Sequence, residues 1–181
     1  MRIETHEVLP EVMLDEAWRL YSAAFDDLRI MAVQRHLMSR EDFDAQMSDP
    51  RVRKYLVYEQ GHGTPLTAVG TLTNDLAAAP LISPDFFRHR WPAFYARRQV
   101  WYVGFYAVHP EHRGSGVFAR LIEEMVKIIA PGVAVVDFCA YNEDVAQLPR
   151  FVLGVLEDIG EVRPQRLDAQ AYWSYEFPAA S

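Results

Sequence analysis

The sequence predicts a single α+β domain, a mixed α/β arrangement in which one central, mostly antiparallel sheet of about seven strands is flanked by helices. Three observations support this prediction. Segments rich in β-branched and aromatic residues, typical of strands, recur along the chain. Between them lie segments whose apolar residues recur at the spacing of amphipathic helices. The 181 residues show no internal repeat, linker or low-complexity segment, so we expect one domain over residues 1–181.

The N-terminal part is expected to form a strand and two helices. Residues 2–8 alternate between apolar and polar and form the first predicted strand. Apolar residues recur at helical spacing from Val12 to Leu28. A second helix is expected to begin at Ser39, because Asp42 follows at the spacing of a capping box, and to end at Pro50.

The middle of the chain is expected to supply a hairpin and a further strand. Residues 51–58 and 65–73 read as two strands, and the glycines around His62 in residues 61–63 indicate the turn between them. Residues 99–108 form a strongly predicted strand, because β-branched and aromatic residues dominate it.

The C-terminal part is expected to add two helices and two strands. A helix over residues 116–130 has one apolar face and one charged face, and Pro131-Gly132 ends it. The uninterrupted apolar run Val133–Cys139 predicts a buried strand at a central position in the sheet. A helical stretch follows through Leu156, and the alternation of residues 171–177 predicts a last strand.

Composition narrows the function classes. A net charge of −7 and a pI near 5.3 argue against a general nucleic-acid-binding protein. The single cysteine, Cys139, excludes an intrachain disulfide and a cysteine-built metal site, which makes a reducing cytosol the default compartment. No apolar run approaches the roughly 20 residues of a membrane helix, and the N-terminus is too polar for a signal peptide. We therefore expect a cytoplasmic protein without nucleic-acid or membrane partners.

The most informative segment runs from Tyr102 to Leu121. It reads as a strand, a short polar turn, a loop with Gly114 and Gly116, and then a helix. Backbone N–H groups at a helix N-terminus, together with the helix dipole, favour an anion. Glycines allow a phosphate to approach the backbone, and Arg113 adds a positive charge at the entrance. The segment therefore predicts a phosphorylated cofactor.

Two known types of phosphate-binding loop could explain this segment. A Walker loop needs a lysine followed by Ser or Thr after its second glycine, which is missing here. Residues 114–119 do fit the dinucleotide pattern G-x-G-x-x-A, and the acidic Asp137 follows near the next strand. However, residues 109–113 separate the strand from the first glycine, and too little chain follows Asp137 to complete a doubly wound sheet. An NAD(P)-dependent oxidoreductase is therefore the weakest of the alternatives.

The segment Val108-His-Pro-Glu-His-Arg-Gly-Ser-Gly-Val resembles motif A of the GNAT acyltransferase superfamily. In that motif a strand ends in hydrophobic-x-Val-x-Pro, and an R/Q-x-x-G-x-G/A loop opens a helix. Arg113 and Gly116 match this pattern, whereas Phe118 stands where the family usually has Gly or Ala. The predicted order of strands and helices over most of the chain is also the order of this family.

The resemblance implies acetyl-CoA, or another acyl-CoA, as co-substrate and the amine of a small molecule as acceptor. The loop would hold the pyrophosphate, and the strand edge before it would pair with the pantetheine arm, because the neighbouring strands of this fold splay apart there. Asn142 stands where the family often has a pantetheine-contacting Asn, although it can equally cap the following helix. The expected cofactor-binding residues are Tyr106, Ala107, Val108, Arg113, Gly114, Ser115, Gly116, Val117, Phe118 and Asn142.

Acyl transfer from a thioester to an amine needs a proton acceptor, a donor to the oxyanion and a proton for the thiolate. The resemblance implies the backbone N–H of Val108 as the oxyanion donor. At the position where many members have a Glu as the base, this chain has Tyr102, a poor base at neutral pH. At the position where the family usually has a Tyr as the acid, this chain has Leu156. Proton transfer then passes through ordered water or through a nearby side chain; the candidates are Tyr141, Glu143, Asp144 and Tyr106.

Three other reactive side chains are not expected to take part. Cys139 lies in a predicted buried strand with no activating histidine nearby, which is typical of inert packing. The sequence shows no third metal ligand near His109 and His112, so we expect both histidines to be ordinary loop residues and expect no metal site.

Residues 75–98 form an insert, since the family joins these strands with a short turn. Loops this long are uncommon unless they are functional or form an interface. Its aromatic and arginine side chains can wall an acceptor pocket, and the candidates are Phe87, Arg88, Trp91 and Tyr95. Alternatively, the insert is a helical lid whose aromatics pack on the sheet and whose arginines are solvated, or it is a homodimer interface.

The sequence thus predicts an N-acetyltransferase that moves an acetyl or other short acyl group from CoA to an amine. The alternative from another class is a non-catalytic acyl-CoA-binding module, because both of the family's usual catalytic side chains are replaced at Tyr102 and Leu156.

Overall fold

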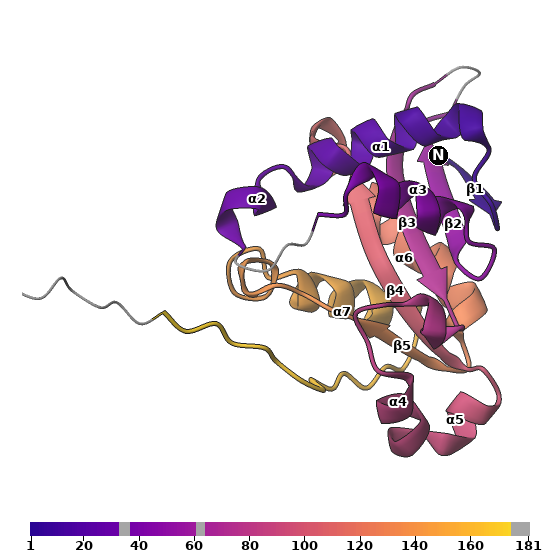
Figure 1. The fold of residues 1–181 in the computed structure, drawn as a ribbon, viewed down its shortest axis with the longest axis vertical. Coiled ribbons are helices and arrows are strands. Elements are labelled where there is room, and N and C mark those ends of the chain that lie inside the picture. Colours follow the sequence, from indigo (N-terminus) through magenta and orange to yellow (C-terminus); the bar gives the residue numbers. More distant parts are fainter. Residues whose placement is uncertain (33–36, 61–63, 175–181) are drawn as a thin grey trace, which may run out of the picture.

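The structure, a computed structural model, describes residues 1–32, 37–60 and 64–174 (Figure 1). One sheet runs through it in the order β1-β2-β3-β4-β5. Strands β1 to β4 are antiparallel to their neighbours, and β5 is parallel to β4. The strands are β1 Arg2–His6, β2 Arg53–Tyr58, β3 Leu66–Thr73, β4 Val100–Val108 and β5 Val133–Val136. The described part of the chain therefore forms five strands rather than the expected seven or so, within the predicted α+β class.

Helices cover both faces of this sheet. Figure 1 shows α1 and α3 on one face and α6 behind the sheet on the other. The helices are α1 Glu11–Phe25, α2 Leu28–Met31, α3 Arg40–Ser48, α4 Pro84–Arg90, α5 Pro92–Ala96, α6 Val117–Ile129 and α7 Leu148–Ile159. Among the described residues, no helix is both long and apolar enough to span a bilayer.

Local signals in the sequence account for most of these elements. The capping box at α3 is confirmed, because the Ser39 hydroxyl accepts from the Asp42 N–H at 3.1 Å and the Asp42 carboxylate accepts from the Ser39 N–H at 3.3 Å. The hairpin of β2 and β3 is also confirmed, while its predicted turn at 61–63 lies outside the described residues. The single helix predicted from Val12 to Leu28 is wrong in its C-terminal part, since α1 ends before the helix-disfavouring Asp26-Asp27 pair.

Two hydrophobic clusters stabilise the sheet from opposite sides. On the α1 and α3 side, residues such as Tyr21, Phe43 and Leu56 are almost fully buried. On the α6 side, Tyr55 and Leu121 are equally buried. Successive residues of β2 thus face opposite helical layers, as the two-residue period of a strand requires.

Strand β4 contains a β-bulge at Gly104. Phe105 pairs with Thr71 and Val103 pairs with Leu72, so Gly104 is left as the extra residue. A Cβ at this position would lie 2.7 Å from the Thr71 hydroxyl, too close for any side chain. The bulge changes the alternation of the strand, so that Tyr102 and Phe105 lie on the same face although three residues separate them.

The predicted central position of β5 is wrong, because β5 is the last strand of the described sheet. It also ends at Val136 rather than Cys139, and none of its four residues is buried. Val135 packs against a third cluster, on the side of the insert, whereas Val136 packs against the α6 cluster. The buried residues of this third cluster are Leu76, Ala79, Phe87, Val100 and Tyr102. The continuous apolar run therefore reflects two covered faces of an edge strand, not two neighbouring strands.

The predicted last strand is not present in the part of the chain that can be described. Residues 171–174 have no strand, and residues 175–177 lie outside the described residues. The side chains of Tyr172 and Trp173 are exposed. The apolar residues of this segment therefore do not form the buried face that the alternation predicted.

Candidate active site

The loop between β4 and α6 contains two glycines in the left-handed backbone region. A 3₁₀ turn, Pro110–His112, leaves the strand and leads into residues 113–116. Gly114 and Gly116 have φ angles of +79° and +83°, in the left-handed region that favours glycine. No atom lies within 4 Å of the Cβ position of either residue, so the space above both glycines is open.

The N-terminus of α6 presents unpaired donors at this loop. Gly116 is the N-cap and provides no side-chain cap, and the first helical bond runs from the Arg120 N–H to the Gly116 carbonyl at 3.0 Å. Within the described ranges, the N–H groups of residues 117–119 have no hydrogen-bond acceptor. With the positive end of the helix dipole, they form a site suited to a phosphate.

The side chain of Arg113 connects this loop to α1. Its guanidinium donates to the Ala24 carbonyl at 2.9 Å and lies 3.7 Å from the Asp27 carboxylate. The Arg113 side chain is still half exposed, so its charge remains at the entrance of the loop as the sequence predicted. Its hydrogen bond to the C-terminal end of α1 adds a positioning role that the sequence did not indicate.

Ser115 and the two histidines stabilise the turn itself. The Ser115 hydroxyl donates to the His112 carbonyl at 2.6 Å. The His109 ring accepts from the Glu111 N–H at 3.4 Å, and the His112 ring lies 3.5 Å from the Glu59 carboxylate. No group of three or more His, Cys, Asp or Glu able to hold a metal occurs among the residues that the structure describes.

Phe118 does not block the loop. Its ring packs edge-on against Tyr106 at 5.0 Å and stacks on Phe151 of α7 at 5.6 Å between ring centroids. The side chain therefore points between β4 and α7, while its N–H group stays at the open helix end. Burial and the neighbouring Tyr55 raise the pKa of the Tyr106 phenol, so Tyr106 stays protonated and does not act as a base.

Strands β4 and β5 diverge beside this loop. Their pairing ends at Val103 and Val136, whereas β4 continues alongside β3 as far as Val108. In the described part of the chain no backbone hydrogen bond joins residues 104–108 to the segment that follows β5. The divergence begins at the Gly104 bulge and leaves one edge of β4 open.

The hydrogen-bond ladder defines which groups occupy that open edge. The His109 N–H donates to the Thr67 carbonyl at 2.9 Å, on the β3 side. Because N–H directions alternate along an antiparallel strand, the N–H groups of Val108 and Tyr106 point to the opposite, open edge. The open edge therefore ends next to the donors of α6.

Tyr102 lies where β4 and β5 are still paired, and its side chain is 4% exposed. Its phenol donates to a carboxylate oxygen of Asp137 at 2.6 Å. Burial, and then the negative charge of Asp137, raises the pKa of Tyr102, so this phenol is a donor at neutral pH and not a base. The sequence drew attention to Asp137 only as part of a dinucleotide pattern, because its contact with Tyr102 depends on the register between β4 and β5.

Tyr141 and Asn142 lie in a π-helical turn, Tyr141–Val145, between β5 and α7. Both are partly buried. The N-cap of α7 is Gln147, so Asn142 does not cap this helix. In the same turn, the Glu143 carboxylate accepts from Arg166 at 3.1 Å and is already paired.

The insert forms two short helices that pack on the sheet. Phe87 is 4% exposed and stacks on Trp91 at 5.9 Å, in the same cluster as Tyr102. Arg88 pairs with Asp85 and lies 5.1 Å from the centroid of the Tyr95 ring. This packing agrees with the lid-like alternative, and it also places the aromatic side chains of the insert beside Tyr102.

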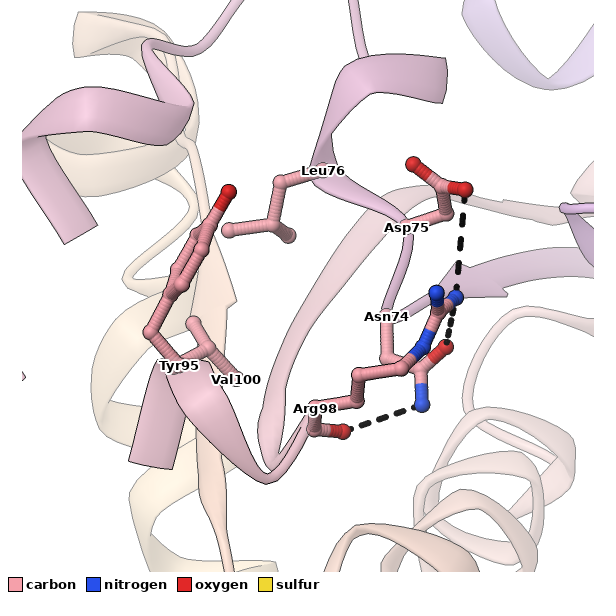
Figure 2. A pocket seen from close by; sticks show the side chains of 6 residues that line it. All are labelled: Asn74, Asp75, Leu76, Tyr95, Arg98 and Val100. Atoms are coloured by element: carbon pink, nitrogen blue, oxygen red, sulfur yellow. Dashed lines mark hydrogen bonds and ion pairs between the residues drawn. The ribbon is translucent and has the colours of Figure 1, made fainter. Parts of the chain in front are cut away.

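A small pocket of about 120 Å³ lies at the base of the insert (Figure 2). Figure 2 shows Arg98 turned toward Asn74 and Asp75. Its guanidinium donates to the Asn74 side-chain oxygen at 3.2 Å and forms an ion pair with the Asp75 carboxylate at 3.8 Å. The Asn74 amide in turn donates to the Arg98 carbonyl at 2.9 Å, which ties the two ends of the insert together. The pocket lies near Val100, roughly 26 Å along β4 from the glycine loop at the usual rise of a strand, so it is separate from the phosphate site.

The fold excludes the dinucleotide alternative, since β1 to β4 are antiparallel and do not form a doubly wound sheet. Solved structures with the same fold include a probable acetyltransferase, with 17% identity, TM-score 0.57 and coverage of 97% of this chain and 99% of that one. Another is an aminoglycoside acetyltransferase from an uncultured soil metagenomic sample, in complex with sisomicin, with 12% identity, TM-score 0.55 and coverage of 97% and 96%.

A third similar structure is the ribosomal-protein-S18-alanine N-acetyltransferase of Escherichia coli, with 14% identity, TM-score 0.51 and coverage of 88% of this chain and 77% of that one. A comparison with curated proteins finds no match. The family model for the GNAT acetyltransferases matches residues 14–131, which include the hairpin, the insert, β4 and α6. The chain therefore belongs to the acetyltransferase (GNAT) family.

Proposed function

We propose that the protein is an N-acyltransferase that moves an acetyl or other short acyl group from acyl-CoA to the amine of a small molecule. One observation carries the proposal: β4 has an open edge that ends at Val108, and Val108 packs in the same cluster as Val117, where the unpaired N–H groups of α6 begin. A long extended ligand with a phosphate group at one end matches this arrangement. The proposal also places the protein in the cytoplasm, in keeping with its single cysteine.

Each part of the acyl-CoA would contact different groups. The N–H groups around Gly116 and Phe118 would hold the pyrophosphate, and the edge of β4 from Tyr106 to Val108 would pair with the pantetheine arm. Such pairing adds an extended ligand to a strand edge by main-chain hydrogen bonds. The N–H of Val108 points to the same edge, where it can donate to the oxyanion of the tetrahedral intermediate.

The acceptor would approach from the other face of the sheet. Tyr102 and the insert lie on the face opposite α6, and the partly buried Trp91 and Tyr95 pack against the same cluster as Tyr102. We therefore propose that this side of the insert borders the acceptor. The acceptor is a small-molecule amine in this proposal; neither metal nor nucleic acid has a role in it.

The anion site can be tested at Gly116 with two variants of equal size. Gly116→Asp places a carboxylate where the phosphate would lie, whereas Gly116→Asn has the same shape without the charge, and both residues tolerate a positive φ better than other side chains. We expect acetyl-CoA to raise the melting temperature of the wild type and of Gly116→Asn clearly more than that of Gly116→Asp. Equal stabilisation of the two variants would contradict the phosphate site.

The non-catalytic alternative rests on the replacement of the usual Glu and Tyr by Tyr102 and Leu156. It predicts tight binding of acetyl-CoA without release of CoA in the presence of any amine. Turnover with at least one amine of a panel would exclude it.

A further inference from the structure

We propose that Asp137 is the catalytic residue that binds the acceptor amine and accepts its proton, and that Tyr102 is the residue that positions it. This inference rests on the proposed function, because it concerns the acceptor side of the same acyl-transfer site. It names a proton acceptor for the reaction, which the resemblance to the family did not supply because Tyr102 replaces the usual Glu.

The position of Asp137 in the sheet is the first argument. Asp137 directly follows Val136, the last residue of β5 that pairs with β4, and therefore stands where the two strands begin to diverge. Val136 packs on the α6 side, and Val135 packs on the insert side together with Tyr102. By the alternation of the strand, Asp137 lies on the insert side, opposite the face that carries α6.

The contact with Tyr102 is the second argument. The phenol is buried and donates to one carboxylate oxygen of Asp137 at 2.6 Å, a short charge-assisted hydrogen bond. This bond orients the carboxylate, because a buried ring has little freedom to move. Asp137 itself is exposed, so its second oxygen remains available to a molecule that approaches from solvent.

The charge of Asp137 is the third argument. Within the described ranges, no lysine, arginine or histidine lies within salt-bridge distance of this carboxylate. Two other acidic residues near this end of the sheet do have such partners: Glu143 pairs with Arg166, and Asp75 lies 3.8 Å from Arg98. A protonated amine would supply a positive charge to this carboxylate, so the acceptor in this proposal is an amine that binds as an ammonium ion.

Two of the other candidates, Tyr106 and Glu143, fit this role less well. The Tyr106 side chain belongs to the α6 side, where its phenol is buried and its pKa is raised. Glu143 is already paired with an arginine. Asp137 therefore combines an open carboxylate oxygen with a position on the acceptor side of the diverging strands.

The reaction that this geometry supports balances as follows. The bound ammonium first loses one proton to solvent through Asp137. The neutral amine nitrogen then attacks the thioester carbonyl carbon and forms the C–N bond, while the Val108 N–H donates to the oxyanion. The nitrogen loses its proton to Asp137, the C–S bond breaks, and its electron pair leaves with sulfur. The proton then passes from Asp137 to the thiolate, directly or through water, so the products are the amide and the CoA thiol, and Asp137 is a carboxylate again.

The test measures two quantities on each variant: acetyl-CoA affinity by calorimetry, and CoA release with butylamine, phenethylamine, spermidine and sisomicin as probes. For Asp137→Asn we expect at least a 100-fold loss of kcat, within the range for general acid–base catalysis, and an unchanged affinity for acetyl-CoA. Asp137→Glu should recover part of the loss. Asp158→Asn, on the exposed end of α7, should behave as wild type.

Tyr102→Phe tests the positioning role. This variant keeps the ring in the cluster and removes only the hydroxyl that holds Asp137. We expect a drop in kcat of about 10-fold with little change in the KM for acetyl-CoA. A purely structural role would instead lower the melting temperature and leave kcat unchanged.

The outcomes separate the two proposals. If wild type does not bind acetyl-CoA, the proposed function fails. If wild type binds acetyl-CoA but releases no CoA with any probe, the proposed acyl transfer and the role of Asp137 both fail, and only the binding site stands. If wild type releases CoA and Asp137→Asn turns over within threefold of it, the proposed function stands and the role of Asp137 alone is overturned.

Discussion

At the scale of single residues, Gly104 has the largest effect on the site. The bulge at this residue ends the pairing of β4 with β5 and places Tyr102 and Phe105 on one face. Gly114 and Gly116 stand out in the sequence because they follow a known loop pattern, and both have positive φ angles in the structure. Gly104 was not singled out, although a glycine inside a strand often marks a bulge; which residues of β3 it would oppose depends on the register between the two strands.

Gly104→Ala should therefore destabilise the protein. The added Cβ would lie 2.7 Å from the Thr71 hydroxyl and 3.2 Å from the Gln46 amide, so β4 must shift away from β3 or lose the bulge. We expect the free energy of unfolding to fall by about 1–3 kcal/mol in urea denaturation. The matched control is Gly154→Ala on α7, where the Cβ meets open space and helix propensity predicts a gain of up to about 1 kcal/mol. Equal effects of the two substitutions would contradict the structural role of the bulge.

Lys54 gives a second prediction at this scale. Its side chain is fully buried and its ammonium donates to the carbonyls of Glu7 and Asp49 at 2.7 and 2.6 Å. Burial lowers the pKa of Lys54 from 10.5 to about 8. Between these two pH values the unfolded chain binds more protons than the folded one, so Lys54 makes the free energy of unfolding increase as the pH rises.

The measurement is urea denaturation of wild type and Lys54→Met at pH 8 and pH 10. The free energy of unfolding of wild type relative to the variant should be larger at pH 10, because a neutral amine still has two N–H donors for the two carbonyls. A difference that is independent of pH, or smaller at pH 10, would show that Lys54 keeps its ordinary pKa in the folded protein.

At the scale of elements, the glycine loop and α6 are the parts that the sequence predicted best. Strand, loop and helix follow one another as expected, because each has strong local signals: β-branched residues, glycines and an amphipathic period. The place of β5 was predicted incorrectly, since an apolar run of valines does not distinguish two covered faces from two neighbouring strands. The contact of Phe118 with Phe151 of α7 could not be predicted from the sequence either, because it joins two separate helices.

Phe118 provides the prediction at the scale of elements. The ring connects β4, α6 and α7 through Tyr106 and Phe151, while the N–H at the helix end is the group proposed to bind phosphate. Phe118→Ala should lower the free energy of unfolding by about 1–3 kcal/mol, less than for a fully buried Phe. Its affinity for acetyl-CoA should change less than threefold. A loss of affinity larger than that of Gly116→Asp would mean that the ring itself contacts the cofactor.

At the scale of the whole molecule, the two ends of β4 have different roles. The C-terminal end leads to the glycine loop, and the N-terminal end receives the insert, whose ends are joined through Asn74 and Arg98. Tyr102 and Asp137 lie between these two regions, where β5 diverges. The sequence predicted the fold class and the two regions separately. It could not bring Asp137 to Tyr102, because that contact depends on the parallel register of β4 and β5.

The measurement that tests the central claim most directly is calorimetric titration of the wild-type protein with acetyl-CoA, CoA, NAD and NADP. The claim is that the loop after β4 and the open edge of β4 together bind acyl-CoA. We predict saturable one-to-one binding of acetyl-CoA and CoA and no binding of NAD or NADP. Binding of NAD or NADP, or no binding of either CoA species, would contradict the account.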